Sequence, residues 1–209
     1  LLILKESLVK INQIIASDFC LKVFMIVLGI DPGSYTTGFA VLEKTTSVKV
    51  LDYGAILCKR SDSADKRLLH IVTELEKILD KYHPDVLSME GVFFAKNPKS
   101  ALMLGQVRGA VLVTCSRYGL SFAEYSPRSV KMAVAGNGAA SKEQVAFMLK
   151  ALLNLSVIEG PLDASDALAI AWTHASPPPL LSMLPPKKKS KKTKDAMRDL
   201  AIRMGAILP

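Results

Sequence analysis

The strongest constraint on the fold of this chain comes from two short, mostly apolar segments that each end in a carboxylate. These segments are Ile26–Asp31 and Asp85–Glu90. Apolar runs of this length predict strands buried inside a sheet. Two further acids, Asp163 and Asp166, lie three positions apart at the start of an apolar segment with helical character, so they share one helical face. A fold that joins these strand ends to this helix start would gather four negative charges in one cleft.

Such a concentration of charge predicts a metal site. At a separation of about 4 Å and an effective dielectric constant near 20, two carboxylates repel each other by roughly 4 kcal/mol. Divalent cations commonly offset this repulsion, and oxygen ligands suit Mg²⁺ or Mn²⁺. The candidate metal ligands and catalytic residues of such a phosphoryl-transfer site are Asp31, Glu90, Asp163 and Asp166.

Each acid also has a simpler explanation. Asp31 precedes Pro-Gly-Ser and would hydrogen-bond its own turn. The same hairpin pattern binds ATP phosphate in actin-like and sugar-kinase ATPases, although such enzymes need two lobes and this chain is short. Glu90 would emerge at the edge of the sheet, and Asp163 would satisfy free N–H groups in the first turn of its helix. Asp166 fits this structural explanation less well, because a buried helix follows it directly.

Apolar periodicity and turn residues predict one α/β domain over residues 25–175. The expected strands are 26–31, 37–43, 48–58, 85–90 and 121–125, and the expected helices are 64–82, 98–118, 127–135, a helix capped by Ser141, and 163–175. The first three strands would form an antiparallel meander. The order βββαβαβα predicts a mixed β-sheet flanked by helices.

The two ends of the chain differ from this domain. Residues 1–24 look like an extension, and because Met25 stands directly before the first strand, translation starting at Met25 is one expectation and an extra helix is the other. Residues 176–209 form a Pro/Lys-rich basic tail. From residue 183 onward, eight basic and two acidic residues give a net charge of +6 of the total +8. Such a tail suits contact with nucleic acid or simple solvation.

Composition excludes several classes of protein. No run of about 18 apolar residues is present, so no membrane span is expected. The first residues carry no basic region of the secretory type, so a secretory signal is not expected. The three cysteines are odd in number and have no ligand spacing, which favours reduced thiols in the cytoplasm.

Basic and aromatic side chains near the acids suggest nucleic-acid contacts. Phe93 belongs to a loop with a second phenylalanine and a lysine, which suits base stacking, although core packing is the alternative. Arg128, Lys131 and Lys142 flank a glycine loop, and the helix that starts after Ser141 adds backbone donors for a phosphate. Ordinary surface charge is the alternative for each of these three residues.

Several segments, taken in order, closely resemble the RuvC family of Holliday-junction resolvases, which are RNase H-like nucleases. The resemblance spans about residues 25–175. The matching segments are Leu28–Ser34 with Thr37 and Gly38, Met89–Asn97, Ser100–Gly109, Tyr125–Lys131, and Asp163–Ala171 with Thr173 and His174.

The resemblance implies a specific activity and site. In such enzymes the residues matching Asp31, Glu90, Asp163 and Asp166 bind metal and act in catalysis. Phe93 would stack on junction bases, and Lys131 and Lys142 would lie near the scissile phosphate. The implied reaction is resolution of four-way DNA junctions by paired symmetric nicks that leave 5′-phosphate and 3′-hydroxyl ends. It would need two Mg²⁺ ions per site, replaceable by Mn²⁺.

The resemblance also implies partners and leaves rivals. A homodimer would match the near-two-fold junction, and the RuvA–RuvB branch-migration helicase complex would be a further partner in the cytoplasm. A non-catalytic junction-binding protein of the same fold is one alternative. A related nuclease that acts on RNA is another.

Overall fold

The computed structural model describes residues 24–91 and 98–176. Its elements are β1 (Met25–Asp31), β2 (Thr36–Lys44), β3 (Val48–Leu57), α2 (Ala64–Tyr82), β4 (Val86–Glu90), α3 (Pro98–Arg117), β5 (Ser121–Tyr125), α4 (Pro127–Ala135), α5 (Lys142–Leu152) and α6 (Leu162–Ala175). The predicted order is confirmed, and each predicted end agrees to within one residue. The N-terminal extension and the Pro/Lys-rich tail lie outside the described residues, apart from one residue of each.

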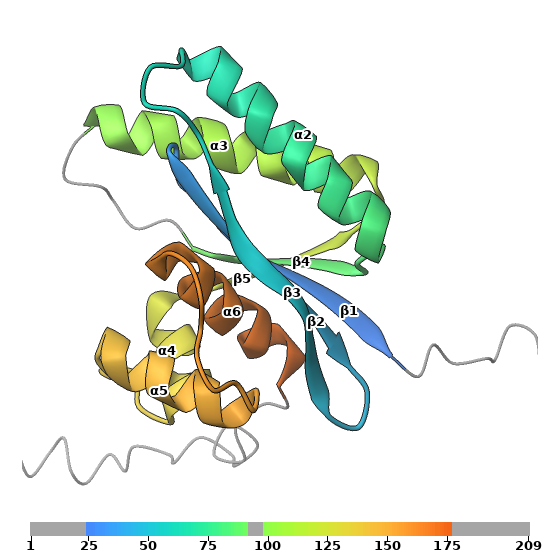
Figure 1. The fold of residues 1–209 in the computed structure, drawn as a ribbon, viewed down its shortest axis with the longest axis vertical. Helices are drawn as coiled ribbons and strands as arrows, with labels where there is room; N and C mark the ends of the chain where they lie inside the picture. Colours follow the sequence, from blue (N-terminus) through green and yellow to red (C-terminus); the bar gives the residue numbers. More distant parts are fainter. Residues whose placement is uncertain (1–23, 92–97, 177–209) are drawn as a thin grey trace, which may run out of the picture. The chain divides into compact units, whose positions relative to one another are not determined.

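The strands form one mixed sheet with the order β3-β2-β1-β4-β5. β1 and β2, and β2 and β3, pair antiparallel, as the predicted meander requires. β4 pairs parallel to β1, and β5 pairs parallel to β4. Helices α2 and α3 cover one face of the sheet, and α4, α5 and α6 cover the other (Figure 1). The central strands are therefore covered on both faces.

Two separate cores result from this layering. Val27 in β1 packs with residues of α4, α5 and α6. Its neighbours Leu28 and Ile30 pack with α2 and α3 on the opposite side. All three side chains are fully buried. Successive strand residues point to opposite faces, so burial on both sides explains the uninterrupted apolar run.

Helix α6 lies unusually close to the sheet because small residues line the contact. A Cβ atom added to Gly38 would overlap the backbone carbonyl of Asp163, and one added to Gly29 would overlap the backbone of Ala167. The hydroxyl of Ser88 in β4 donates a hydrogen bond of 3.1 Å to the carbonyl oxygen of Ile170, which ties the helix to the middle of the sheet. The start of α6 is thereby held directly over β2.

The described helices include none that has both the length and the apolar character needed to cross a membrane.

The Gly38 contact predicts a large effect of one added methyl group. Gly38→Ala should lower the free energy of unfolding by roughly 1–3 kcal/mol, because the new Cβ pushes against backbone rather than a movable side chain. Urea unfolding followed by circular dichroism measures the change. Gly105→Ala is the matched control, since Gly105 lies within α3 with no atom near its added Cβ, and this change should be neutral or stabilising. Equal stabilities of the two variants would contradict this account of the α6 contact.

Candidate active site

The sheet brings the first two acids to the same edge. β1 and β4 run parallel, with Ile30 paired to Met89. Asp31 and Glu90 are the next residues and end these adjacent strands. In open α/β sheets, ligands bind at the carboxyl ends of such strands. The two carboxylates predicted from separate apolar segments therefore lie at neighbouring strand ends.

Helix α6 brings the other two acids to this edge. Gly38 lies opposite Asp31 in the β1–β2 pairing, and the backbone of Asp163 rests against Gly38. The first turn of α6 is thus placed beside the end of β1. Asp166 follows one turn along the helix. The residue at the N-cap is Pro161 and makes no side-chain capping bond, so the acids of this helix do not serve as its N-cap.

Electrostatic coupling shows that the four acids share one site. The pKa of Asp31 is raised from 3.8 to about 7, first by burial and then by the charges of Asp166, Asp163 and Glu90, in that order of importance. Lys142 acts in the opposite direction. Burial and the charge of Asp166 also raise the pKa of Glu90. The edge of the sheet is therefore a place where negative charge is unfavourable without a nearby cation.

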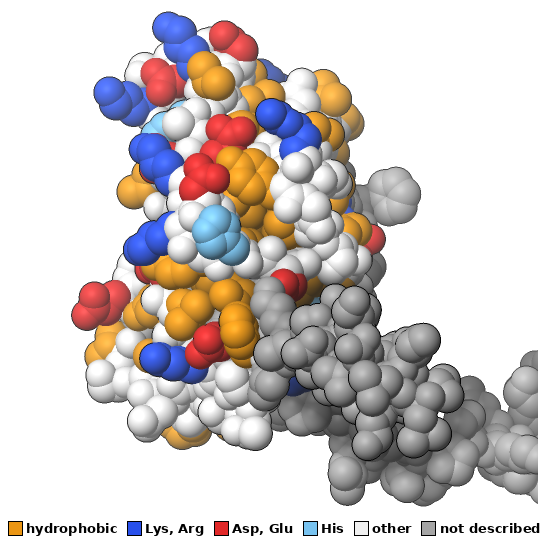
Figure 2. Space-filling model, turned by 90° about the vertical axis from the view of Figure 1, so that its right-hand side faces the viewer, with side chains coloured by type: hydrophobic (Ala, Val, Ile, Leu, Met, Phe, Trp, Pro, Cys, Tyr) orange, Lys and Arg blue, Asp and Glu red, His pale blue; other side chains and the backbone are white. Residues whose placement is uncertain are grey.

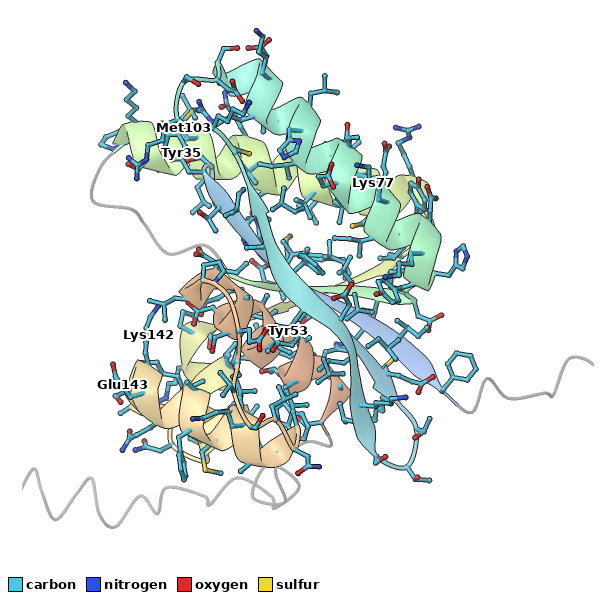
Figure 3. All side chains as sticks on the ribbon, viewed as in Figure 1. Tyr35, Tyr53, Lys77, Met103, Lys142 and Glu143 are labelled. Atoms are coloured by element: carbon cyan, nitrogen blue, oxygen red, sulfur yellow. The ribbon has the colours of Figure 1, made fainter. Side chains whose placement is uncertain are left out.

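Two lysines reach the site from α4 and α5. The ammonium of Lys142 lies 2.9 Å from Oδ2 of Asp166, and this hydrogen bond is the main cause of the raised pKa of Lys142. The charge of Lys131 offsets part of the rise in the pKa of Glu90. One cavity of about 220 Å³ is lined by both lysines and by two of the acids, Glu90 and Asp166. Figure 3 labels Lys142 at the start of α5, where the Ser141–Gln144 capping box fixes the first turn.

The acids are not arranged as a finished metal site. Within residues 24–91 and 98–176, no group of three or more Asp, Glu, His or Cys side chains is placed so that it could hold a metal ion. This differs from the predicted convergence on a common point. Mutual repulsion and the ion pair between Lys142 and Asp166 account for the difference, because the lysine supplies the counter-charge. The donor chemistry still fits a divalent cation, since the groups are carboxylates whose charge such an ion would relieve.

The other predicted DNA-binding residues are not at this site in the described structure. Arg128 is exposed on α4 and its side chain packs against Gly138. It is not among the residues that line the cavity of Glu90 and Asp166. Phe93 lies outside the described residues. The roles of both side chains remain predictions.

Sequence analysis missed the residue that holds the end of β4. Arg108 in α3 donates a hydrogen bond of 2.8 Å to the carbonyl oxygen of Glu90 and a second of 2.7 Å to Oε1 of Glu124 in β5. Its side chain is only 12% exposed. An arginine beside the buried Val107 of α3 is a signal of such a role, because a buried guanidinium needs acceptors. The Arg108 contact positions the strand end that carries Glu90.

A second cross-connection joins β5 to α6. The hydroxyl of Tyr125 and Nδ1 of His174 are 2.8 Å apart. Burial lowers the pKa of His174, so the ring tends to be neutral. This half-buried histidine at the end of α6 has a packing and bonding role.

Comparisons with known proteins give consistent results. The family model for crossover junction endodeoxyribonuclease RuvC matches residues 27–174. The RuvC of Chloroherpeton thalassium is 49% identical over 148 residues, which cover 70% of this chain and 80% of that protein. The RuvC of Caldicellulosiruptor saccharolyticus is 45% identical over 152 residues, covering 72% of this chain and 92% of that protein. The structure of Thermus thermophilus RuvC in complex with a Holliday junction substrate has a TM-score of 0.66 and 32% identity, covering 72% of this chain and 92% of that one.

The family match spans the whole described domain. This chain belongs to the RuvC family. It is therefore a crossover junction endodeoxyribonuclease, an enzyme that acts on DNA. Its fold is the RNase H-like α/β fold of the solved RuvC structure, which confirms the predicted fold class. The roles of individual residues of this RuvC-family chain remain predictions.

The raised pKa of Asp31 predicts a pH-dependent stability. Without divalent metal, the folded protein keeps a proton on Asp31 up to about pH 7, whereas the unfolded chain releases it near pH 3.8. Stability therefore falls as the pH rises between these values. Asp31→Asn should remove this loss and raise the free energy of unfolding at pH 8 by about 2 kcal/mol, after discounting for solvent screening.

Urea unfolding in EDTA at about pH 4 and about pH 8 measures this difference. The advantage of Asp31→Asn over the wild type should be small at the lower pH and full at the higher one. Parallel pH profiles for the two proteins would show that the Asp31 carboxyl titrates as it does in an unfolded chain.

Proposed function

We propose that this enzyme resolves Holliday junctions by paired, symmetric nicks. One observation carries the proposal: four acids from β1, β4 and α6 are coupled at one sheet edge, beside two lysines, in a chain of the RuvC family. The related Thermus thermophilus RuvC has been solved with a Holliday junction substrate. Nicks that leave 5′-phosphate and 3′-hydroxyl ends would suit this role, because such ends can be ligated directly.

An RNase H-like nuclease implies dependence on a divalent metal, and we propose two Mg²⁺ ions per site, replaceable by Mn²⁺. The residues that would hold them are Asp31, Glu90, Asp163 and Asp166. Bound divalent ions supply charge stabilisation for the attacking and leaving oxygens. The unfavourable charge on the half-buried Asp31 supports this assignment, because a cation would lower the free energy of its ionised form.

The lysines supply fixed positive charge next to the acids. Lys142 is paired with Asp166 in this structure. If Asp166 bound a divalent cation, the ammonium of Lys142 would be available to a phosphate oxygen. Lys131 lines the same cavity. Either lysine would stabilise charge that grows on the phosphate during attack.

The surface of the described domain favours one side for DNA. Lys142, which is paired with Asp166, is labelled on the left side of the molecule in Figure 3. Figure 2 shows the opposite side, where blue and red side chains are interspersed among the described residues. A mixed surface of this kind offers a DNA backbone little net attraction. We therefore place the junction on the side of the acids.

The assembly and setting of the enzyme are also proposals. Two symmetric nicks need two active sites, so a two-fold homodimer would match the near-two-fold substrate. A RuvA–RuvB branch-migration complex would act on the same junction and is a proposed partner. The proposed location is the cytoplasm.

A nicking assay tests the activity and its site. Incubation with a mobile four-way junction and Mg²⁺ should give symmetric nicks in the junction and leave a linear duplex intact. Glu90→Gln should reduce nicking by more than the roughly 10- to 100-fold typical of losing a residue that only supports a metal ligand. Junction binding should persist. Denaturing gels and gel-shift titrations measure the two effects.

Glu76→Gln is the matched control for this assay. Glu76 lies on α2, where it makes a 4.0 Å ion pair with Arg117 and is not among the residues that line the cavity of Glu90, so full nicking is expected. Equal cutting of the linear duplex by the wild type would contradict the selectivity for junctions. Full activity of Glu90→Gln would contradict the assignment of the site.

Thermal unfolding tests metal binding without measuring catalysis. At pH 8, Mg²⁺ at 100 times its dissociation constant should stabilise the wild type by about 2.7 kcal/mol and raise its Tm. Asp166→Asn should reduce this shift, because it removes a proposed ligand. Asp80→Asn, at an exposed position of α2, loses the same charge and should keep the full shift. Identical shifts in all three proteins would argue against the acids as ligands.

A further inference from the structure

A second cavity lies next to the turn that follows Asp31. It has a volume of about 600 Å³ and lies where the β1–β2 turn, the start of α2 and the start of α3 meet. The residues that line it include Ser34, Tyr35, Arg67, Lys99, Ser100 and Met103. Figure 3 labels Tyr35 and Met103 close together at this end of the molecule. None of the acids of the candidate active site lines this cavity.

Arg67 is the unusual residue of this cavity. Its exposed fraction is only 7%. The Nη1 group donates to the backbone carbonyl of Asp62, but the buried Nε has no hydrogen-bond partner in the described part of the chain. A buried donor without an acceptor typically costs about 1–3 kcal/mol, and more when it is charged. Arg67 lines the cavity and keeps one buried donor without a partner, so an acceptor oxygen that reached this guanidinium would relieve that cost.

Tyr35 holds two arginines in place. The guanidinium of Arg67 lies 4.7 Å from the centre of the Tyr35 ring, and that of Arg60 lies 5.4 Å from it. Contacts of this kind orient the planar guanidinium groups. Lys99 adds a further positive charge, and no acidic residue is among the described residues that line the cavity. The combined charge suits an anion with several oxygens.

The turn that carries Tyr35 is firmly held. The amide of Cys58 donates a 2.9 Å hydrogen bond to the carbonyl of Tyr35. The hydroxyl of Thr37 donates a 2.7 Å hydrogen bond to the carbonyl of Gly33. A Cβ atom on Gly33 would overlap the carbonyl of Thr36, so only glycine fits this turn. The cavity is therefore formed before any ligand binds.

The chain itself sets how far this cavity is from the acids. Tyr35 is four residues from Asp31, so their Cα atoms are at most about 14 Å apart. DNA carries one phosphate per strand for about every 3.4 Å of helix axis. A phosphate at Arg67 and a phosphate at the acids would then be separated by only a few nucleotides of one DNA strand or of neighbouring strands.

We propose that Arg67, with Arg60 and Lys99, binds a backbone phosphate of the DNA substrate a few nucleotides from the cleaved bond. The proposal rests on the proposed function. Guanidinium groups bind phosphate oxygens through paired hydrogen bonds, and the spare Nε of Arg67 is one such donor. A contact to phosphate positions the substrate and carries no sequence information. The site would therefore orient an arm of the junction relative to the acids.

The first test removes charge from the exposed part of the site. The double variant Arg60→Gln with Lys99→Gln should weaken binding of a four-way junction in EDTA. It should also reduce the slope of log K against log salt by about 1, the value expected for one lost phosphate contact. Lys77→Gln with Lys81→Gln is the matched control, since both lysines lie on α2 away from the cavity. This control should bind with the wild-type slope.

Arg67 is tested by a conservative change, because its removal risks unfolding the domain. Arg67→Lys keeps the charge but loses Nε and the planar group that stacks on Tyr35. It should bind the junction more weakly than the wild type, with thermal unfolding confirming that the domain is folded. If a folded Arg67→Lys protein bound the junction with wild-type affinity, the proposed role of the Arg67 guanidinium would be overturned.

The second test locates the phosphate on the DNA. Neutral methylphosphonate groups are placed one at a time at successive phosphates on both sides of the cleaved bond. At the contacted position, the neutral group should weaken wild-type binding severalfold but leave the Arg60→Gln, Lys99→Gln protein unchanged. If the neutral group weakened binding by the same factor in the wild type and in the double variant at every position, the proposal would be overturned.

The outcomes separate this inference from the proposed function. A wild type that nicks the junction, together with a double variant that binds like its control, would overturn only the phosphate site at Arg67. A wild type that fails to bind the junction would overturn both.

Discussion

The close contact between α6 and the sheet is the constraint on which the rest of the structure depends. Gly29 and Gly38 have no room for a Cβ atom because the backbone of α6 occupies that space. The helix is apolar and almost wholly buried after its first turn. Since it rests directly on β1 and β2, its first turn carries Asp163 and Asp166 to the strand end that carries Asp31. A helix packed at an ordinary distance would leave these acids on separate surfaces.

Charge at this edge is balanced in the absence of metal by the protein itself. Lys142 approaches from α5, and its ion pair with Asp166 offsets part of the repulsion among the acids. The ion pair also explains why the described acids are not arranged as ligands. A divalent cation bound at Asp166 would thus take the place of the Lys142 ammonium. Under the proposed function, Lys142 would have two alternative partners, the carboxylate of Asp166 and a phosphate.

Local patterns in the sequence were enough to predict the helices and strands. They gave less information about which residues contact each other between these elements. Both central strands are buried on two faces, so their apolar runs were unambiguous. Caps were equally informative: Ser126 and Ser141 accept the hydrogen bonds that begin α4 and α5. The four acids were predicted because charge at the end of a buried strand or beside a buried helix is costly. Their charges are coupled at one edge of the sheet, and their role as metal ligands stays a prediction.

Residues that act through distant contacts could not be predicted in the same way. Arg108 bonds to the carbonyl of Glu90, which is 18 residues away in the chain, and no local pattern indicates which carbonyl it reaches. Arg67 looks like an ordinary helical arginine until the turn at Tyr35 folds against it. The partner of Lys142 is 24 residues away. Such pairs depend on how the helices and strands pack against each other, and local sequence patterns do not predict that packing.

The raised pKa of Asp31 has a consequence for how the enzyme would respond to its surroundings. Near neutral pH, a substantial fraction of molecules carries a proton on this carboxyl. Protons and divalent cations would then compete for the same oxygens. Uptake of a cation would release protons, so the heat of binding would vary with the ionisation heat of the buffer. Mild acidification would weaken cation binding while the fold itself gains stability.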